Sequence, residues 1–253
     1  MTMTDGMPAA TPRLSLVVPA FNESALLPRL LDSVAIARSR YTHGPEAIEV
    51  LVADNGSTDD TAAIAERYDC RVVPVAPRNI GAVRNGGARE ARGEFLCFVD
   101  ADGRVHPDVF NVVDAALASG KYSVGATGVI PERWSFGIAC TFAVLVPLLW
   151  VTRIDTGLVF CRRDDFNAIG GYDERWPAAE DVMFHLAMIK AGWKRGQRPT
   201  RTTQVKGIAS MRKFDKYGDW HYFTLFPRGL ALLFRKGGMT EYIKGYWYVD
   251  TRD

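Results

Sequence analysis

The sequence contains little cysteine, which zinc-binding and disulfide-rich proteins use in characteristic patterns. Only four of its 253 residues are cysteine, and they are scattered at Cys70, Cys97, Cys140 and Cys161. Without a CxxC pair or a dense cluster, we expect neither a zinc site of the usual spacing nor a disulfide scaffold. Three of the four lie in apolar surroundings, so we interpret them as small core residues of a chain in a reducing compartment.

Net charge is also small, at +2. A nucleic-acid-binding domain normally carries a strongly basic patch, so we expect no nucleic-acid partner. Lys and Arg become denser after residue 190. That region would suit a phosphorylated or membrane-surface acceptor, although we favour the simpler interpretation of a solvated basic face.

The sequence also lacks a typical targeting segment and a typical membrane-spanning segment. The first 13 residues, MTMTDGMPAATPR, lack a basic start and an apolar centre, so we expect no signal peptide and a cytoplasmic location. Residues 136–151 form an uncharged apolar run of 16 residues that contains Pro147. Because a spanning helix needs about 20 such residues, we expect a helix that is buried or lies in the membrane interface. Peripheral contact with the inner face of the membrane stays open.

What the sequence does contain is a regular alternation of apolar strands and helices. Hydrophobic residues make up 47% of a chain long enough for one large, well-buried domain. The expected strands of the first half are 14–18, 48–53, 72–75 and 95–99, and the expected helices are 24–38, 58–67 and 80–92. Wholly apolar strands separated by helices predict an α/β fold with a mostly parallel, Rossmann-like sheet and helices on both faces.

The second half of the chain is less regular. It contains an expected strand at 156–161, a helix at 180–191 and a basic, aromatic end. We expect one domain over residues 1–253, with a first half at about 14–105, a second half at about 106–215 and a C-terminal segment at about 216–253.

Acidic residues follow the strands at the sheet edge where ligands bind in such folds. Asp54 comes directly after an apolar strand, where a carboxylate is costly unless it has a polar partner. Asp100 and Asp102 follow residues 95–99 and form a DxD pair. Two carboxylates at a strand end suit a hard cation such as Mg²⁺ or Mn²⁺. Ser57, Thr58 and Asp59 are explained as well by helix capping as by ligand binding.

A set of motifs extends in order over roughly residues 14–192 and reads VVPAFNE, VADNGSTDDT, NIGAVRN, GEFLCFVDAD, GGYDE and EDVMF. This ordered set resembles the family 2 glycosyltransferases, members of the nucleotide-diphospho-sugar transferase superfamily with the GT-A fold. The resemblance implies that residues 14–105 form the nucleotide-binding half and residues 106–215 the acceptor and catalytic half. The resemblance implies an inverting enzyme that transfers a sugar from a nucleotide diphosphate, typically a UDP-sugar, to an acceptor hydroxyl.

The resemblance also implies roles for individual residues. Pro19, Ala20 and Glu23 would line the nucleoside pocket, and Asp54 would hydrogen-bond the base. Arg84 would lie near the donor, and Asp100 would face the ribose or the metal. Asp102 would ligate Mn²⁺ or Mg²⁺ between the two phosphates. Asp181 would be the catalytic base, although Glu180 and Asp181 also complement the dipole of a helix start.

The chain departs from the family pattern in two places. The family often has an arginine six residues after the catalytic aspartate, and here that position is Ala187. Arg212 or Lys213 would then supply the missing phosphate or acceptor contact. The QxxRW motif of processive synthases is absent, which favours transfer of one sugar per encounter.

Histidine ligation and two rival functions remain open from sequence. His221 follows the catalytic helix, where some GT-A enzymes place a late metal ligand, but packing beside Trp220 and Tyr222 explains it as well. A nucleotidyltransferase would also use carboxylate-bound Mg²⁺, but would carry a glycine-rich loop where this chain has PAFNES. A catalytically inactive sugar-nucleotide-binding protein would not need Asp102 and Asp181.

Overall fold

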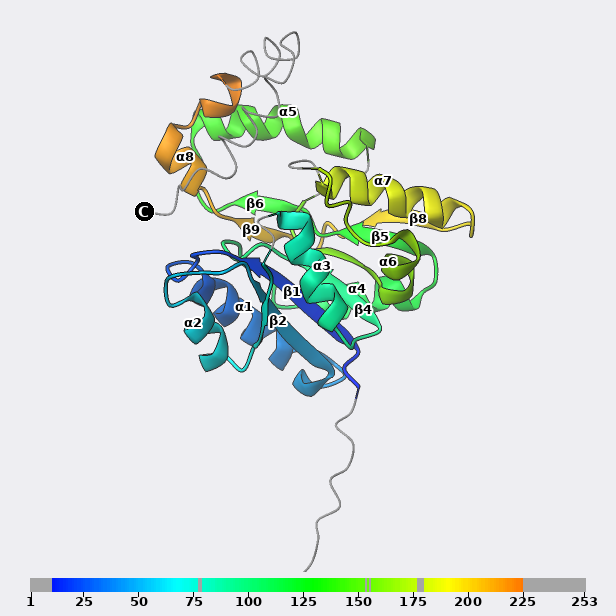
Figure 1. Ribbon diagram of the computed structural model, residues 1–253. Helices are drawn as coiled ribbons and strands as arrows, with labels where there is room; N and C mark the ends of the chain where they lie inside the picture. The colour runs from blue at the N-terminus through cyan, green and yellow to red at the C-terminus, as the bar shows by residue number, and fades with distance from the viewer. Residues whose placement is uncertain (1–10, 77–78, 153, 155, 177–179, 225–253) are drawn as a thin grey trace, which may run out of the picture.

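The computed structural model describes residues 11–76, 79–152, 154, 156–176 and 180–224 (Figure 1). A seven-stranded sheet in the order β3-β2-β1-β4-β7-β5-β8 lies at its centre. The strands are β1 Leu14–Ala20, β2 Ile48–Asp54, β3 Arg71–Pro74, β4 Phe95–Phe98, β5 Tyr122–Ala126, β7 Val159–Arg162 and β8 Arg198–Arg201. Strands β1, β2, β3 and β4 pair in parallel, and β7 alone runs antiparallel, between β4 and β5. The predicted mostly parallel sheet is confirmed.

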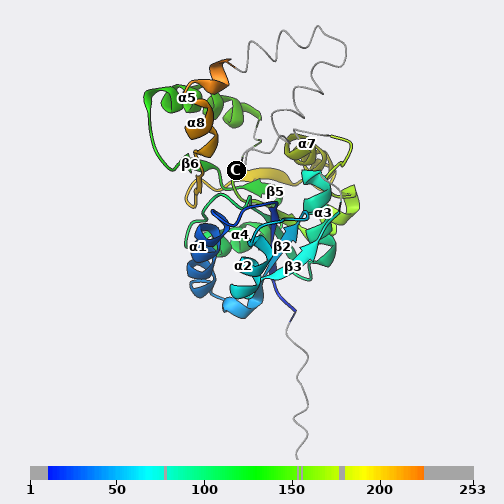
Figure 2. The same cartoon turned by 60° about the vertical axis from the view of Figure 1, so that its left-hand side comes forward.

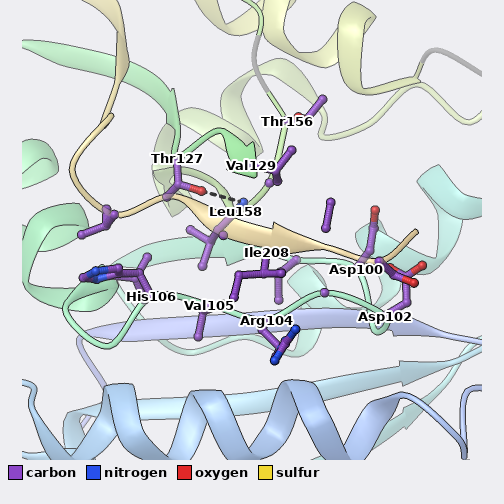
Figure 3. Close-up of a pocket in the computed structure, with 18 residues that line it drawn as sticks. Asp100, Asp102, Arg104, Val105, His106, Thr127, Val129, Thr156, Leu158 and Ile208 are labelled. Carbon is purple, nitrogen blue, oxygen red and sulfur yellow. Dashed lines mark hydrogen bonds between the residues drawn. The ribbon is translucent and has the colours of Figure 1, made fainter. Parts of the chain in front are cut away.

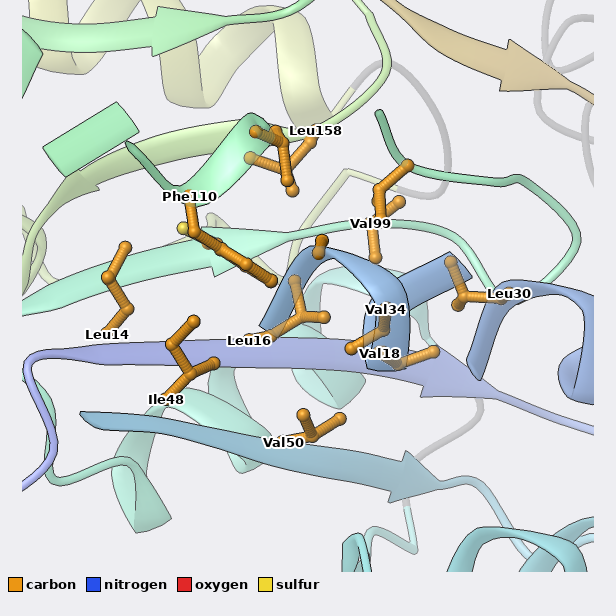
Figure 4. Close-up of a cluster of buried hydrophobic side chains, with 14 of the residues drawn as sticks. Leu14, Leu16, Val18, Leu30, Val34, Ile48, Val50, Val99, Phe110 and Leu158 are labelled. Carbon is orange, nitrogen blue, oxygen red and sulfur yellow. The ribbon is translucent and has the colours of Figure 1, made fainter. Parts of the chain in front are cut away.

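Helices cover both faces of the sheet, as predicted. Alternate residues of β1 point to opposite faces: Leu16 and Val18 pack in one core and Val17 in the other. The first core lies under α1 (Leu27–Ser39), α2 (Thr61–Arg67) and α4 (Val109–Ala118) and includes the cluster in Figure 4. The second lies under α3 (Ile80–Glu90), α6 (Arg163–Ile169) and α7 (Glu180–Trp193).

Helix α3 lies unusually close to the sheet because its inner face carries glycine. A Cβ on Gly87 would be 2.4 Å from a methyl carbon of Val17 and 3.3 Å from the Cβ of Ala53. A Cβ on Gly86 would meet Val75 in the same way. The NGG sequence therefore lets this helix, which carries Arg84, approach the carboxyl ends of β1 and β2.

Two predicted helices begin three residues later than expected. The expected starts at 24 and 58 lie instead in two loops that hydrogen-bond each other. The amide of Ser24 donates to Asp59, and the amide of Thr58 donates to Asn22. Because these groups pair across the loops, α1 begins at Leu27 and α2 at Thr61. The strand expected at 156–161 likewise lies later, at Val159–Arg162.

The second half adds a smaller layer above the sheet (Figures 1 and 2). Strands β6 (Val129–Pro131) and β9 (Gly207–Ala209) pair in parallel, and the short helix α8 (Arg212–Tyr217) follows β9 in the sequence.

A three-residue 3-10 helix, η1, spans Pro45–Ala47 in the first half. Cys70, Cys97 and Cys161 are buried, as expected.

Helix α5 (Phe136–Thr152) corresponds to the apolar run. Val144 and Leu145 on this helix are exposed, so the expectation of a buried helix is wrong for this face. Within the described residues, no helix has both the length and the apolar character that crossing a membrane requires.

Candidate active site

The ends of β1 and β2 are interlocked by their following loops. Ala20 and Asp54 are register partners, and the amide of Asn55 donates to the carbonyl of Ala20 over 2.9 Å. Asp54 accepts hydrogen bonds from the amide and hydroxyl of Ser57. The hydroxyl of Ser57 also accepts one from the amide of Asn22, a residue with a φ of 50°. Asp54 is therefore held at the sheet edge by local groups.

Asp59 strengthens this connection between the two loops. Its carboxylate accepts hydrogen bonds from the amides of Ser24 and Thr61, and the hydroxyl of Thr61 in turn accepts from the amide of Glu23. Burial acts to raise the pKa of Asp59, but the donors from Thr61 and Ser24 outweigh it and lower the pKa to about 2. Asp59 is consequently ionised at neutral pH and serves the loop structure.

The DxD residues lie on a loop attached to strand β9. Arg104 and Ile208 exchange backbone hydrogen bonds of 3.0 and 2.9 Å, and the amide of Gly103 donates to the carbonyl of Asp100. Asp100 is exposed, whereas Asp102 is partly buried. This attachment brings the segment after β9 beside the DxD pair, although about a hundred residues separate them in sequence.

Arg212, the first residue of α8, joins this segment to two strand ends. Its guanidinium makes two hydrogen bonds to Glu23, of 2.8 and 3.0 Å, and its Nε lies 3.1 Å from Oδ2 of Asp102. Burial raises the pKa of Asp102 to about 6; Arg212 opposes this rise, while Asp100 and Glu23 add to it. Glu23, Asp100 and Asp102 thus lie close together, and Arg212 pairs directly with Glu23 and Asp102.

A second arginine, Arg84 on α3, connects the DxD loop to the start of α7. Its guanidinium donates hydrogen bonds to Asp100 over 2.9 Å and to Glu180 over 2.7 Å. A guanidinium nitrogen of Arg84 also lies 3.8 Å from a carboxylate oxygen of Asp181. Its guanidinium is buried and lies over the ring of Tyr172. Arg84 therefore holds carboxylates from both halves of the chain at one place.

The two acidic residues at the start of α7 occupy different environments. The side chain of Glu180 is 8% exposed and that of Asp181 is 43% exposed. Burial raises the pKa of Glu180 to about 7, and the charge of Asp181 adds to this rise. For Asp181, burial is outweighed by the positive charge of Arg84 and a hydrogen bond from Glu180, which lower its pKa. Asp181 is therefore the accessible, ionised member of the pair.

A cavity of about 170 Å³ opens beside the DxD pair. Figure 3 shows Asp100 and Asp102 at one end and His106 at the other. Valine, leucine and isoleucine side chains line much of it, and Thr127 and Thr156 add hydroxyl groups. Small-molecule sites usually measure about 300–1,000 Å³, so this cavity accommodates part of a ligand.

His221 packs in an aromatic cluster. Its ring lies 4.9 Å from that of Phe214 and 4.1 Å from that of Tyr222, and Nδ1 pairs with the carbonyl of Gly218. Burial lowers its pKa. Among the residues that the structure describes, no three His, Cys, Asp or Glu side chains converge to hold a metal ion. The structure does not bring His221 together with Asp102 in such a group, and its ligation stays a prediction.

The structure brings most of the predicted site residues to one edge of the sheet. Pro19 and Ala20 are buried at the end of β1, next to Asp54 on β2. Glu23 and Asp102 meet through Arg212, and Asp100 and Asp181 meet through Arg84. Their roles toward a donor or metal stay predictions. The sequence analysis did not identify Asn22 as a residue that links the two loops. Its position next to Glu23 in the loop after β1 was the signal that could have indicated this role.

Comparison with known proteins identifies the family of the chain. The family model described as Glycosyl transferase family 2 matches residues 15–141, half of the chain. The chain belongs to this family. A PGL/p-HBAD biosynthesis glycosyltransferase of Mycobacterium bovis is 31% identical over 185 residues, which cover 70% of each chain.

Two further proteins show how far the similarity extends. A validoxylamine A glucosyltransferase of Streptomyces hygroscopicus is 40% identical over 121 residues, covering 44% of this family 2 chain and 26% of that protein. The chain thus matches about a quarter of that relative's length. Glucosyl-3-phosphoglycerate synthase of Mycobacterium tuberculosis, solved with Mn²⁺, UDP and glucosyl-3-phosphoglycerate, has the same fold. Its TM-score is 0.53 at 20% identity, over 76% of this chain and 71% of that one.

Proposed function

We propose that this chain is an inverting, non-processive glycosyltransferase that moves a sugar from a nucleotide diphosphate to an acceptor hydroxyl. The observation that carries the proposal is the pair of carboxylate groups linked by Arg84: the DxD loop on one side and Asp181 on the other. A donor-phosphate site and a proton acceptor would then lie on either side of the bond to be broken.

The nucleoside of the donor would bind at the ends of β1 and β2. Asp54 is preorganised there by Ser57, and carboxylates accept hydrogen bonds from the N–H groups of a base. Pro19, Ala20 and Glu23 would form the adjoining wall. We propose a UDP-sugar as the donor, in keeping with the UDP bound by the mycobacterial synthase of the same fold.

The charge of the site fits a divalent cation. Glu23 and Asp102 pair with Arg212, and Asp100 pairs with Arg84. Burial raises the pKa of Asp102 despite the positive charge of Arg212. Mg²⁺-like ions often take one or two protein carboxylates and complete their shell with substrate phosphates. Asp102, with Asp100, would hold the ion, which would neutralise charge that builds on the leaving diphosphate. The mycobacterial synthase structure with Mn²⁺ supports a divalent ion in this fold.

Asp181 would act as the general base. Its carboxylate would take the proton of the acceptor hydroxyl while that oxygen bonds to the anomeric carbon. The bond from that carbon to the diphosphate oxygen breaks with its electron pair, and the nucleoside diphosphate leaves. One displacement inverts the anomeric centre, and Arg84 keeps Asp181 ionised for this step.

A donor-hydrolysis screen, in which water takes the place of the acceptor, tests the proposal. Purified protein is incubated with UDP-, GDP- and dTDP-sugars with Mn²⁺ or with chelator, and release of nucleoside diphosphate is measured. We expect Mn²⁺-dependent release from a UDP-sugar that is lost in Asp102→Ala. Turnover by Asp102→Ala in chelator would contradict the metal-dependent assignment, and binding without turnover would favour a sugar-nucleotide-binding protein.

A further inference from the structure

Helix α5 is apolar around its circumference. It contains no charged residue over Phe136–Thr152. Ile138 and Phe142 pack against the α8 segment, whereas Val144 is 60% and Leu145 41% exposed on another side. A helix with apolar residues on all sides normally lies in an apolar medium, either a protein core or a membrane. For α5, the described protein supplies such a medium on only one side.

Aromatic side chains extend this exposed surface. Trp134 and Phe136 are exposed before and at the start of α5, and Trp220 and Phe223 are exposed after α8. The ring of Trp220 lies 5.8 Å from that of Phe136 and 5.5 Å from that of Phe223. The α5 surface therefore consists of Trp134, Phe136, Val144, Leu145, Trp220 and Phe223. Figures 1 and 2 show α5 and α8 together at one end of the molecule.

Charge favours an anionic lipid surface as the partner. Residues 212–253 contain eight Lys and Arg and five Asp and Glu, a surplus of three positive charges in a chain whose net charge is +2. All of the positive excess thus lies in the sequence from residue 212 onward. The described part of that sequence includes α8, which packs against α5 and contains Lys213 and Lys216. Basic residues near a bilayer are attracted to anionic headgroups by about 1 kcal/mol each.

We propose that the α5 surface docks onto the headgroup region of an anionic lipid bilayer, with α5 lying along the membrane. At about 1.5 Å per residue, its 17 residues extend about 26 Å, less than the ~30 Å hydrocarbon core. Tryptophan is enriched at this depth, where one part of the ring is apolar and another is wet. The ion pairs of Arg133 with Asp215 and Asp219 hold α5 and α8 together as one surface.

The docking surface connects directly to the catalytic edge. Phe214 of α8 packs with Ile138 of α5, and Arg212, two residues earlier in the same helix, contacts Asp102. A bilayer under α5 would therefore lie one short helix from the DxD pair. The proposal itself does not depend on the transferase activity, because it concerns lipid binding alone.

Vesicle co-sedimentation tests the proposal. The full chain is mixed with vesicles of phosphatidylcholine alone, or of phosphatidylcholine with an equal part of phosphatidylglycerol. We expect binding to the anionic vesicles and at least about tenfold weaker binding after Val144→Glu with Leu145→Glu, because each buried Val or Leu contributes about 1.5–3 kcal/mol. Ile36→Glu, at a residue of α1 that is 51% exposed and away from α5, is the matched control and should bind like the parent.

The other outcomes overturn the proposal. These are failure of the parent chain to bind anionic vesicles, or equal loss of binding in Ile36→Glu. A third contradictory outcome would come from light scattering of the parent chain without lipid. If the parent is a dimer that Val144→Glu dissociates, the α5 surface binds a second copy of the chain and not a membrane. Circular dichroism of each variant establishes that it is folded, and Trp220→Ser, at the other edge of the surface, provides a variant that adds no charge.

Discussion

Glu180 and Asp181 are adjacent in sequence, yet their environments suit them to different tasks. Glu180 is buried against Arg84, and Asp181 is accessible and ionised. Asp181→Asn should lower kcat by ~10²–10⁴, the usual contribution of a general base, because the amide cannot accept the proton. Binding of the nucleotide, measured by calorimetry, should be unchanged. If Asp181→Asn keeps its kcat while Glu180→Gln is inactive, the base is Glu180.

The contact between Arg84 and Asp181 leads to a prediction for the pH dependence of kcat. Its positive charge lowers the pKa of Asp181, so removing it should raise that pKa and leave the base protonated up to a higher pH. In Arg84→Gln the acidic limb of the kcat–pH profile should move upward by ~1 pH unit, a typical effect of one nearby charge. Arg84→Lys keeps the charge and should show a smaller shift. Identical limbs in the parent and Arg84→Gln would show that Arg84 does not control the base.

Arg212 contacts Asp102, the residue that we propose as a metal ligand. Because Arg212 and a bound Mn²⁺ would neutralise the same carboxylate, Arg212→Gln should raise the affinity for Mn²⁺ in the absence of nucleotide. We expect roughly a tenfold increase, since a hydrogen bond between charged groups contributes about 1.5–3 kcal/mol. Paramagnetic resonance of free Mn²⁺ gives the affinity directly. Lys216→Gln, an exposed residue of the same helix, is the control, and equal affinities in all three proteins would exclude competition.

At the scale of elements, the packing of α3 on the sheet decides where Arg84 lies. Gly87→Ala would place a methyl group 2.4 Å from Val17, so the helix would have to move away from β1. The overpacking cost of about 1–3 kcal/mol should exceed the gain of up to about 1 kcal/mol in helix propensity. Thermal unfolding should show a lower Tm, whereas Glu90→Ala, exposed on the same helix, should change it little.

The same elements differ in how well the sequence predicts them. Strands β1, β2 and β4 were predicted nearly to the residue, because apolar runs that are buried on both faces leave little choice of structure. The starts of α1 and α2 were not, because Ser24, Thr58 and Asp59 could equally cap a helix or pair with a neighbouring loop. That choice depends on Asn22 pairing with Thr58 and on Asp59 pairing with Ser24 across two loops, which no local pattern contains.

For the whole molecule, the two halves of the chain meet through the arginines. Arg84 in the first half of the chain contacts Glu180 in the second, and Arg212 in the second half contacts Glu23 and Asp102 in the first. Neither pairing follows from spacing, since the partners are far apart in sequence. Arg212 was proposed from sequence only as a replacement for the arginine missing at Ala187.

The sequence alone determined the alternation of strands and helices, the edge of the sheet that carries the carboxylates and the family resemblance. These properties follow from local apolar periodicity and from motifs a few residues long. Only the tertiary structure decided which carboxylate is buried, which arginine neutralises it and which side of α5 is left uncovered. Burial and ion pairing depend on what the rest of the chain brings to a residue, so they emerge only when distant segments pack together.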